Sequence, residues 1–260
     1  MAPKKIEIRL NNIIALLKEQ NGASIKHLSQ MLDVTEMTVR RDLRTLQDEG
    51  IVTMIHGAAI YNPNAEDSLN HSYTIQKCSP VMKDEKSRIG KAAANLVESN
   101  DILFVDSGTT TSQLIRNLPN GMDIVLNCFS YNIFSEAKTR GVENIYLGGG
   151  IFHYDTEAFE SPETLKMVES TRATKAFIVP NAIEKNLGFM CVQEYEMNLK
   201  RSFIANSMQR IILADSSKFG RVTQCFFCDF QDVDILITDD GISSEWKDFL
   251  GSKNIKLIIV

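Results

Sequence analysis

The sequence predicts an α/β protein in two parts, a small N-terminal helical domain that ends in a β-hairpin and a larger α/β domain. Residues 5–49 carry three apolar patterns of helical spacing, separated by short turns. Two short β-prone runs around His56-Gly57 follow directly. From residue 84 onward, short apolar runs alternate with helical patterns. This alternation is typical of a mainly parallel sheet with helices on both faces.

Length and composition are consistent with two globular domains. The chain has 260 residues, of which 43% are hydrophobic and 23% charged. Glu7 and Arg9 interrupt the apolar run near the N-terminus, so it does not read as a signal peptide. No apolar run reaches membrane-spanning length. We therefore expect a cytoplasmic protein with no membrane partner.

The N-terminal domain, residues 1–61, has the order helix, helix, tight turn, helix, hairpin. The first helix spans residues 5–20 and stops at Asn21-Gly22. Ser24 can cap a short second helix, and Asp33-Val34 makes the turn into the third. This order indicates a helix-turn-helix, and the hairpin after it is expected to form a wing.

The third helix, residues 35–49, has two chemically different faces. Val39, Leu43 and Leu46 form an apolar stripe that must be buried. Thr35 suits the N-cap and Gly50 the C′ position. The opposite face is rich in arginine and suits the major groove of DNA. The residues predicted to contact DNA, on this helix and in the hairpin turn, are Thr35, Thr38, Arg40, Arg41, Arg44, Thr45 and His56.

Overall charge does not favour nucleic acid, because the net charge is −5. Residues 1–61 contain eight Lys or Arg and seven Asp or Glu, so this domain is nearly neutral. Glu36 and Asp42 offset part of the arginine charge on the third helix itself. One copy should therefore bind DNA weakly, and we expect a dimer or higher homo-oligomer to present paired helices.

A linker is predicted at residues 62–80 and the α/β domain at residues 81–260. The segment 62–67 has turn composition and no periodicity. The expected strands are 102–105, 124–127, 144–147, 175–179, 210–214, 235–238 and 255–260. The expected helices include 84–99, 130–140, 162–170, 195–207 and 243–250.

Three loops after predicted strands have the composition of a ligand site. Loop 106–111 has one glycine and three threonines leading into a helix, which suits an anion. Gly148 and Gly149 permit close approach of the backbone to a ligand. Lys218, in the loop 215–220, is a point charge suited to phosphate, and Lys200 is a further candidate. Ligands of α/β sheets bind where such loops meet.

The five cysteines do not indicate a disulfide framework. Cys225 and Cys228 have CxxC spacing, but neither a second pair nor nearby histidines are evident for zinc. We interpret both as small buried side chains in an apolar strand, and we expect no metal and no cofactor.

The motifs of both domains resemble the DeoR family of bacterial transcriptional regulators. The N-terminal match is L-D-V-T-E-M-T-V-R-R-D-L (32–43), followed by L-Q-D-E-G-I-V (46–52) and H-G-A-A (56–59). Ala58 stands where many members have glycine. The C-terminal match includes D-S-G-T-T-T (106–111), L-G-G (147–149) and A-D-S-S-K-F-G (214–220).

The resemblance implies a C-terminal effector domain similar in fold to ribose-5-phosphate isomerase, with a sugar-phosphate pocket. The residues it implies there, with the two glycines above, are Asp106, Gly108, Thr109, Thr110, Thr111, Ser130, Gly148, Gly149, Glu194, Lys200, Asp215 and Lys218. The chain departs from the family pattern at Asn127-Cys128-Phe129-Ser130 and at Pro180-Asn181. The second departure is expected to reshape the pocket.

These features predict a DNA-binding repressor of a carbohydrate operon, released by a phosphorylated sugar, and not an enzyme. One alternative is a sugar-phosphate isomerase with an attached DNA-binding domain. It needs a carboxylate base and an acid or lysine at the substrate, and the acidic turn of the isomerase relatives is not found here. The other alternative is a redox or metal sensor that uses Cys225 and Cys228.

Overall fold

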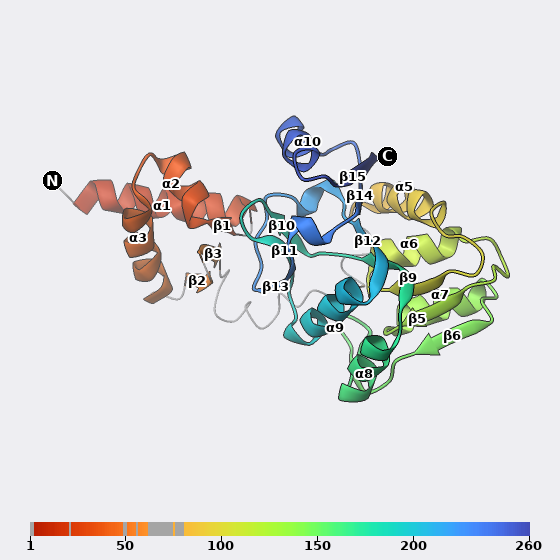
Figure 1. The fold of residues 1–260 in the computed structure, drawn as a ribbon. Coiled ribbons are helices and arrows are strands. Elements are labelled where there is room, and N and C mark those ends of the chain that lie inside the picture. Colours follow the sequence, from red (N-terminus) through yellow and green to blue (C-terminus); the bar gives the residue numbers. More distant parts are fainter. Residues whose placement is uncertain (1–2, 21, 49–50, 56, 62–74, 76–80) are drawn as a thin grey trace.

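The computed structural model describes residues 3–20, 22–48, 51–55, 57–61, 75 and 81–260 (Figure 1). Within them the chain forms the two expected parts, and the predicted α/β class is confirmed. Gly50, His56 and all but one residue of the 62–80 segment lie outside the described residues.

The N-terminal domain is a three-helix unit with a small sheet, and its order matches the prediction. Its elements are α1 (Pro3–Gln20), β1 (Ala23–Ser24), α2 (Ile25–Leu32), α3 (Glu36–Asp48), β2 (Val52–Ile55) and β3 (Ala58–Tyr61). The hairpin strands β2 and β3 pair antiparallel. The two-residue strand β1 was not predicted. It pairs with β3, so the sheet joins the wing to the start of α2.

Local side-chain bonds set where the helices of this domain begin. Ser24 caps α2, because its hydroxyl accepts a hydrogen bond from the His27 amide at 3.1 Å. Thr35 does the same for α3, accepting from the Thr38 amide at 3.3 Å. The apolar stripe of α3 is buried against α1 and α2. The polar face of α3 is therefore left outside.

The C-terminal domain is built on one seven-stranded sheet with the strand order β15-β14-β12-β9-β4-β5-β6. Every neighbouring pair is parallel. Its strands are β4 (Ile102–Val105), β5 (Val125–Cys128), β6 (Asn144–Leu147), β9 (Ala173–Ile178), β12 (Ser207–Leu213), β14 (Ile235–Thr238) and β15 (Lys256–Ile259).

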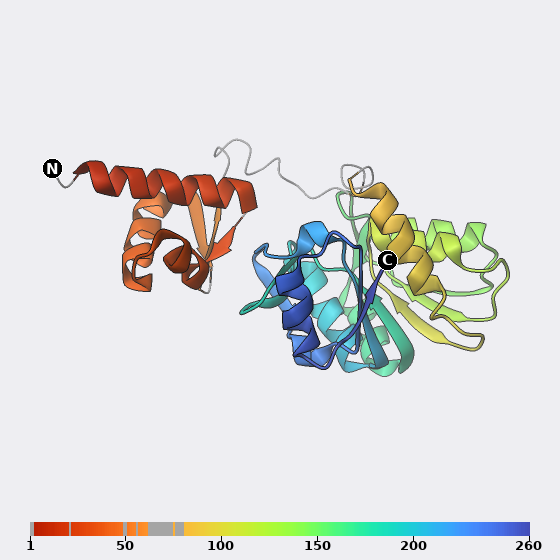
Figure 2. The same ribbon diagram turned by 90° about the horizontal axis from the view of Figure 1, so that it is seen from above.

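Helices cover both faces of this sheet, as Figures 1 and 2 show. One face packs against α5 (Lys83–Ala94), α6 (Thr109–Asn117) and α7 (Tyr131–Thr139) through an apolar core that includes Leu103, Leu114 and Ile133. The other face packs against α8 (Pro162–Ser170), α9 (Glu194–Ala205) and α10 (Ser244–Gly251), around Phe104 and Phe203. The two cores explain the near-continuous apolar runs of the central strands.

Two small antiparallel sheets were not anticipated as units. The first contains β10 (Ala182–Glu184), β11 (Gly188–Cys191) and β13 (Cys225–Cys228), in the order β10-β11-β13. The second is the hairpin of β7 (Ile151–His153) and β8 (Ala158–Glu160). Two 3₁₀ turns, η1 (Ser216–Lys218) and η2 (Phe230–Asp232), complete the elements of the described residues. The β10-β11-β13 sheet matters most, because it lies against the N-terminal domain.

Candidate functional site

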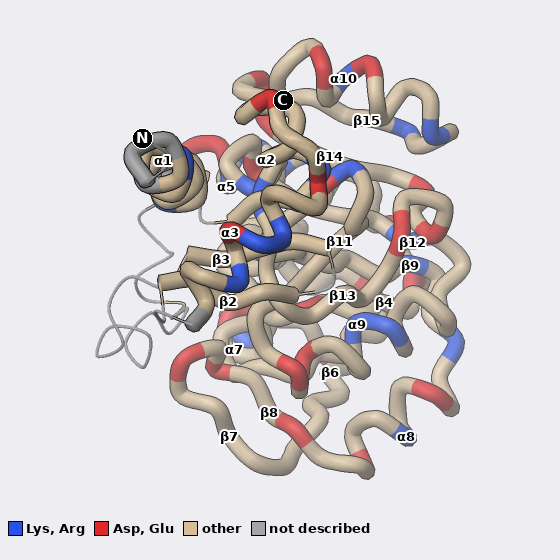
Figure 3. The backbone as a smooth tube through the Cα atoms, turned by 90° about the vertical axis from the view of Figure 1, so that its left-hand side faces the viewer, with Lys and Arg blue, Asp and Glu red and all other residues tan. Residues whose placement is uncertain are grey.

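The exposed face of α3 is the candidate nucleic-acid interface. Arg40, Arg41 and Arg44 are all exposed. Arg40 lies 4.0 Å from Glu36, whereas Arg41 and Arg44 have no ion-pair partner among the described residues. The helix faces the viewer in Figure 3, with its basic positions in blue. Thr35 and Thr45 are also exposed, and Thr38 is half-buried. Cations held on a rigid helix in this way suit phosphates and base edges.

The candidate effector pocket lies at the carboxyl ends of β4, β9 and β12. The chain leaves β4 in one direction, to β5 and β6, and later returns on the other side, to β9 and β12. The gap between β4 and β9 is therefore the switch point of the sheet, where ligands of open α/β folds bind. Its wall includes the loop 107–110, residues 179–181 after β9, and Ala214, Asp215 and Lys218 after β12.

A buried ion pair closes the floor of this pocket. The Lys200 ammonium group donates to Asp106 Oδ2 and, at 3.1 Å, to the carbonyl of Val179. The same Asp106 oxygen accepts from the Val179 amide at 2.9 Å. Burial alone would lower the pKa of Lys200, but the carboxylates of Asp106 and Glu196 outweigh it and raise that pKa. Lys200 therefore presents a permanent positive charge to the pocket.

Glu196 lies one helical turn before Lys200 and also lines the pocket. Its burial raises its pKa to about 7, against the opposing effect of the Lys200 charge. The group thus changes charge near neutral pH. The other charged residues in the wall are Lys86, Asp215 and Lys218.

The start of α6 supplies donors to the same pocket. Gly108 precedes the helix, and the first amide groups of a helix have no partner within it. Thr109, Thr110 and Lys218 line the pocket, and Lys218 has no ion-pair partner among the described residues. A cation, a helix N-terminus and hydroxyl groups are together suited to a phosphate.

Half of the predicted effector residues lie in the wall of this pocket. These are Gly108, Thr109, Thr110, Lys200, Asp215 and Lys218. Asp106 lies behind Lys200 and lines a small adjoining cavity. Thr111 is fully buried and donates to the Gly108 carbonyl.

The other predicted residues lie apart from the pocket wall. Ser130 is fully buried at the end of β5. Gly148 packs beside Phe129 and Thr164, and the Gly149 carbonyl accepts from the Ser161 and Thr164 hydroxyls. Glu194 is exposed and lines a different surface hollow.

Pro180 and Asn181, the departure expected to reshape the pocket, line its wall, whereas Lys86 and Glu196 escaped sequence reasoning. Glu196 had a usable signal, because a residue four positions before Lys200 must share its helix face. Glu194 lies six positions before Lys200, so it does not share the helix face of Lys200. Lys86 had no such signal, since only the packing of α5 on α6 brings it to the pocket.

The cysteine interpretation agrees with the structure. Cys225 and Cys228 are free and buried in the strand β13. Burial raises the pKa of both thiols, which makes them poor nucleophiles. Among the described residues, no cluster of His, Cys, Asp or Glu is arranged to hold a metal ion. No described helix combines the length and apolar character that crossing a membrane requires.

Two family models match the chain. A DeoR-like helix-turn-helix domain matches residues 9–65. A DeoR C terminal sensor domain matches residues 81–240, more than half of the chain.

Curated relatives match over nearly the full length. The lactose phosphotransferase system repressor of Staphylococcus aureus is 31% identical over 236 residues, covering 89% of this chain and 91% of the relative. The deoxyribose operon repressor of Escherichia coli is 27% identical over 252 residues, covering 97% of this chain and 98% of the relative.

Among solved structures, ribose 5-phosphate isomerase A of Methanocaldococcus jannaschii matches with a TM-score of 0.39 and 16% identity. The match covers 53% of this chain and 55% of the isomerase. This similarity is too low to support an argument about activity.

Proposed function

Because this chain belongs to the DeoR family of transcriptional regulators, we propose that it represses a carbohydrate operon and is released by a phosphorylated sugar. The observation that carries the proposal is the pairing of an exposed arginine-bearing α3 with a separate pocket of phosphate-binding character. The relatives above are named as repressors, one of a lactose phosphotransferase system and one of a deoxyribose operon, so they favour a regulator over the isomerase alternative.

The proposed DNA contact is made by α3 in the major groove. Arg41 and Arg44 contact phosphates or base edges, Arg40 and the threonines Thr35, Thr38 and Thr45 support them, and the wing around His56 contacts the backbone. A repressor of this kind acts in the cytoplasm, where the DNA lies. Since one α3 carries few free cations, operator binding requires a homo-oligomer that places two such helices on neighbouring half-sites.

The proposed effector site is the pocket between β4, β9 and β12. The phosphate binds at the start of α6 with Lys218, and the sugar hydroxyls reach Glu196, Asn181 and Asp215. The effector acts by binding the arrangement with low DNA affinity better than the arrangement with high DNA affinity. It changes DNA affinity by no more than the difference between its own affinities for the two arrangements.

The test is a binding experiment with two readouts. Purified protein is titrated onto DNA from upstream of its own transcription unit, by fluorescence anisotropy, with a panel of phosphorylated and unphosphorylated sugars. We expect specific binding, weakened by one or more phosphorylated sugars and by none of their unphosphorylated forms. The same sugar phosphates are assayed for isomerisation. Turnover that disappears in Glu196→Gln would show that the protein is an enzyme.

A further inference from the structure

We propose that the 215–222 loop couples the effector pocket to the packing of the N-terminal domain on the C-terminal domain. We call the packed arrangement seated. One side of this loop is a wall of the pocket, and the other side holds the N-terminal domain. A phosphorylated ligand that opens the pocket displaces the loop and releases that domain. The inference rests on the proposed function, and it names the part of the chain through which the effector acts.

The pocket is too small to accept a sugar phosphate as it stands. Its free volume is about 20 Å³, which is enough for roughly one water molecule. Ligand sites in proteins are typically about 300–1,000 Å³. A wall must therefore move when a ligand enters.

Two segments of the wall, the loop 107–110 and residue 179, are held firmly. The Ser107 hydroxyl donates to the Thr156 carbonyl at 2.7 Å, and an added Cβ on Gly108 would stand 2.7 Å from Val179. Val179 is itself fixed by the buried Asp106 and Lys200. These contacts leave little room for the loop 107–110 or for residue 179 to retreat.

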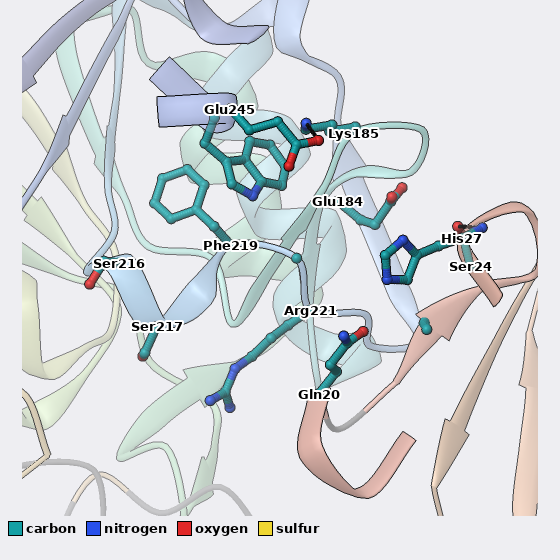
Figure 4. Close-up of a pocket in the computed structure, with 13 residues that line it drawn as sticks. Gln20, Ser24, His27, Glu184, Lys185, Ser216, Ser217, Phe219, Arg221 and Glu245 are labelled. Carbon is teal, nitrogen blue, oxygen red and sulfur yellow. Dashed lines mark hydrogen bonds and ion pairs between the residues drawn. The ribbon is translucent and has the colours of Figure 1, made fainter. Parts of the chain in front are cut away.

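The 215–222 segment of the wall is tied at Ser216, whose amide donates to Asp239 Oδ1 at 2.6 Å, but it has open space behind it. Ser216, Ser217, Phe219 and Arg221 line a second cavity, of about 410 Å³, between the two domains. Figure 4 shows these residues on one side of the cavity and Gln20, Ser24 and His27 of the N-terminal domain on the other. The His27 side chain points toward Glu184 of β10. We call this space the junction cavity. It gives the 215–222 loop somewhere to move when Lys218 and Asp215 adjust to a ligand.

The same loop is bonded to the small sheet that contacts the wing. The Gly220 amide donates to the Ile183 carbonyl of β10 at 2.9 Å. At the end of the loop, Val222 is buried with Ala182 and Met190 of the small sheet and with Ala58 of the wing strand β3. We call these four residues the junction contact.

The backbone beside the junction contact is closely packed. A Cβ added to Gly22, just before β1, would stand 3.3 Å from the Val222 carbonyl oxygen and 3.4 Å from its Cβ. A shift of the loop by even an ångström cannot be absorbed by side-chain movement at such a close backbone approach. It must instead move the N-terminal domain or break the contact.

The seated arrangement is the DNA-competent one. Among the side chains that the structure describes, none from α3 lines the junction cavity or belongs to the junction contact, and the arginines of α3 remain exposed. Seating therefore leaves the DNA-binding face free and fixes its angle to the rest of the protein. In an oligomer that angle sets the spacing of two α3 helices against the half-sites. Releasing the domain loses the fixed spacing and weakens the operator complex.

The first test makes position 222 a reporter of seating. In a Cys78→Ser background, Val222→Cys introduces a thiol that is buried while the domain is seated, and its rate of reaction with a soluble thiol reagent is followed. Inorganic phosphate is the probe. We expect phosphate to accelerate labelling several-fold, and to have no effect when Lys218→Ala is added. Ser170→Cys, an exposed position on α8, is the control whose labelling should not respond.

The second test breaks the junction contact. Val222→Asp should weaken operator binding by about tenfold and abolish the effect of phosphate on that binding. Val222→Ala should keep both the operator affinity and the effect of phosphate. Phosphate-independent labelling of the Val222→Cys variant, or normal regulation by Val222→Asp, would overturn the coupling alone. Failure of the unaltered protein to bind operator DNA would overturn the proposed function as well.

Discussion

Arg9 of α1 and Asp42 of α3 form a two-pronged ion pair on the inner side of the DNA-binding helix. Arg9 Nε lies 2.5 Å from Asp42 Oδ2, and its terminal nitrogen lies 3.0 Å from Oδ1. The Asp42 side chain is only 4% exposed. The sequence alone suggested that Asp42 offsets the arginine charge that DNA meets. The structure shows instead that Asp42 points inward and is neutralised by Arg9.

Breaking this pair should destabilise the N-terminal domain. Asp42→Asn leaves the Arg9 charge without its partner, and we expect a loss of about 2–4 kcal/mol in unfolding free energy. Glu36→Gln is the matched control, because the Glu36–Arg40 pair is exposed and 4.0 Å apart, and it should cost less than about 0.5 kcal/mol. Denaturant unfolding of the full chain, followed by circular dichroism, measures the loss of unfolding free energy in each variant. Equal effects would mean that the Arg9–Asp42 pair contributes no more than a surface pair.

Arg41 should contribute directly to operator recognition. It is exposed and free of ion pairs among the described residues, so Arg41→Ala removes a contact without disturbing the core. We expect operator binding to weaken by about 1–3 kcal/mol if the side chain reads a base. Sugar-phosphate binding should be unchanged. Arg172→Ala, an exposed arginine of the effector domain, is the control. An Arg41→Ala variant with the original operator affinity would remove this residue from the interface.

Lys218 should matter for the effector and not for DNA. Lys218→Ala removes a cation that lines the same pocket as the start of α6, so phosphorylated sugars should bind at least about tenfold more weakly. Operator affinity without effector should stay the same. Lys166→Ala on α8 is the control, being exposed and remote from the pocket. Calorimetric titration gives the effector affinity. A variant that loses DNA binding yet responds normally would exclude Lys218 from the pocket.

Glu196 should make stability depend on pH. Burial raises its pKa from 4.5 to about 7, so the folded state binds a proton more readily than the unfolded state. Its contribution is fully present below pH 4.5 and is lost as the pH rises toward 7. Glu196→Gln imitates the protonated form, so the variant should match the unaltered protein at about pH 4.5 and be more stable above about pH 7, by on the order of 1–3 kcal/mol.

Melting temperatures of both proteins at about pH 4.5, 6 and 8 measure this difference, and the comparison cancels groups that titrate alike in both. A constant difference across this range would show that Glu196 keeps one protonation state.

Most helices and strands could be predicted from the sequence because their causes are local. The stripe of Val39, Leu43 and Leu46 repeats at helical spacing, and a strand such as Ile102–Val105 is an unbroken apolar run. Caps are equally local, since Ser24 and Thr35 bond to amides three residues ahead. The strand β1 was missed because two residues carry no periodicity and it exists only through its pairing with β3.

The effector site was predictable in part. The loop 106–111 and the residues Asp215 and Lys218 follow strands, so topology alone directs them to one edge of the sheet. Gly148 and Gly149 also follow a strand, but β6 lies at the far edge, so they do not reach the switch point. Strand order is a long-range property, and no local pattern encodes it.

The sequence by itself determined the two-domain order, the DNA-binding helix and the chemistry of the phosphate loops. These depend on periodicity, capping and residue type within short segments. Only the tertiary structure decided that Asp42 faces Arg9, that Glu196 and not Glu194 lines the pocket, and that Val222 holds the wing. Each of those depends on which distant segments pack together, because burial and charge pairing act between neighbours in space.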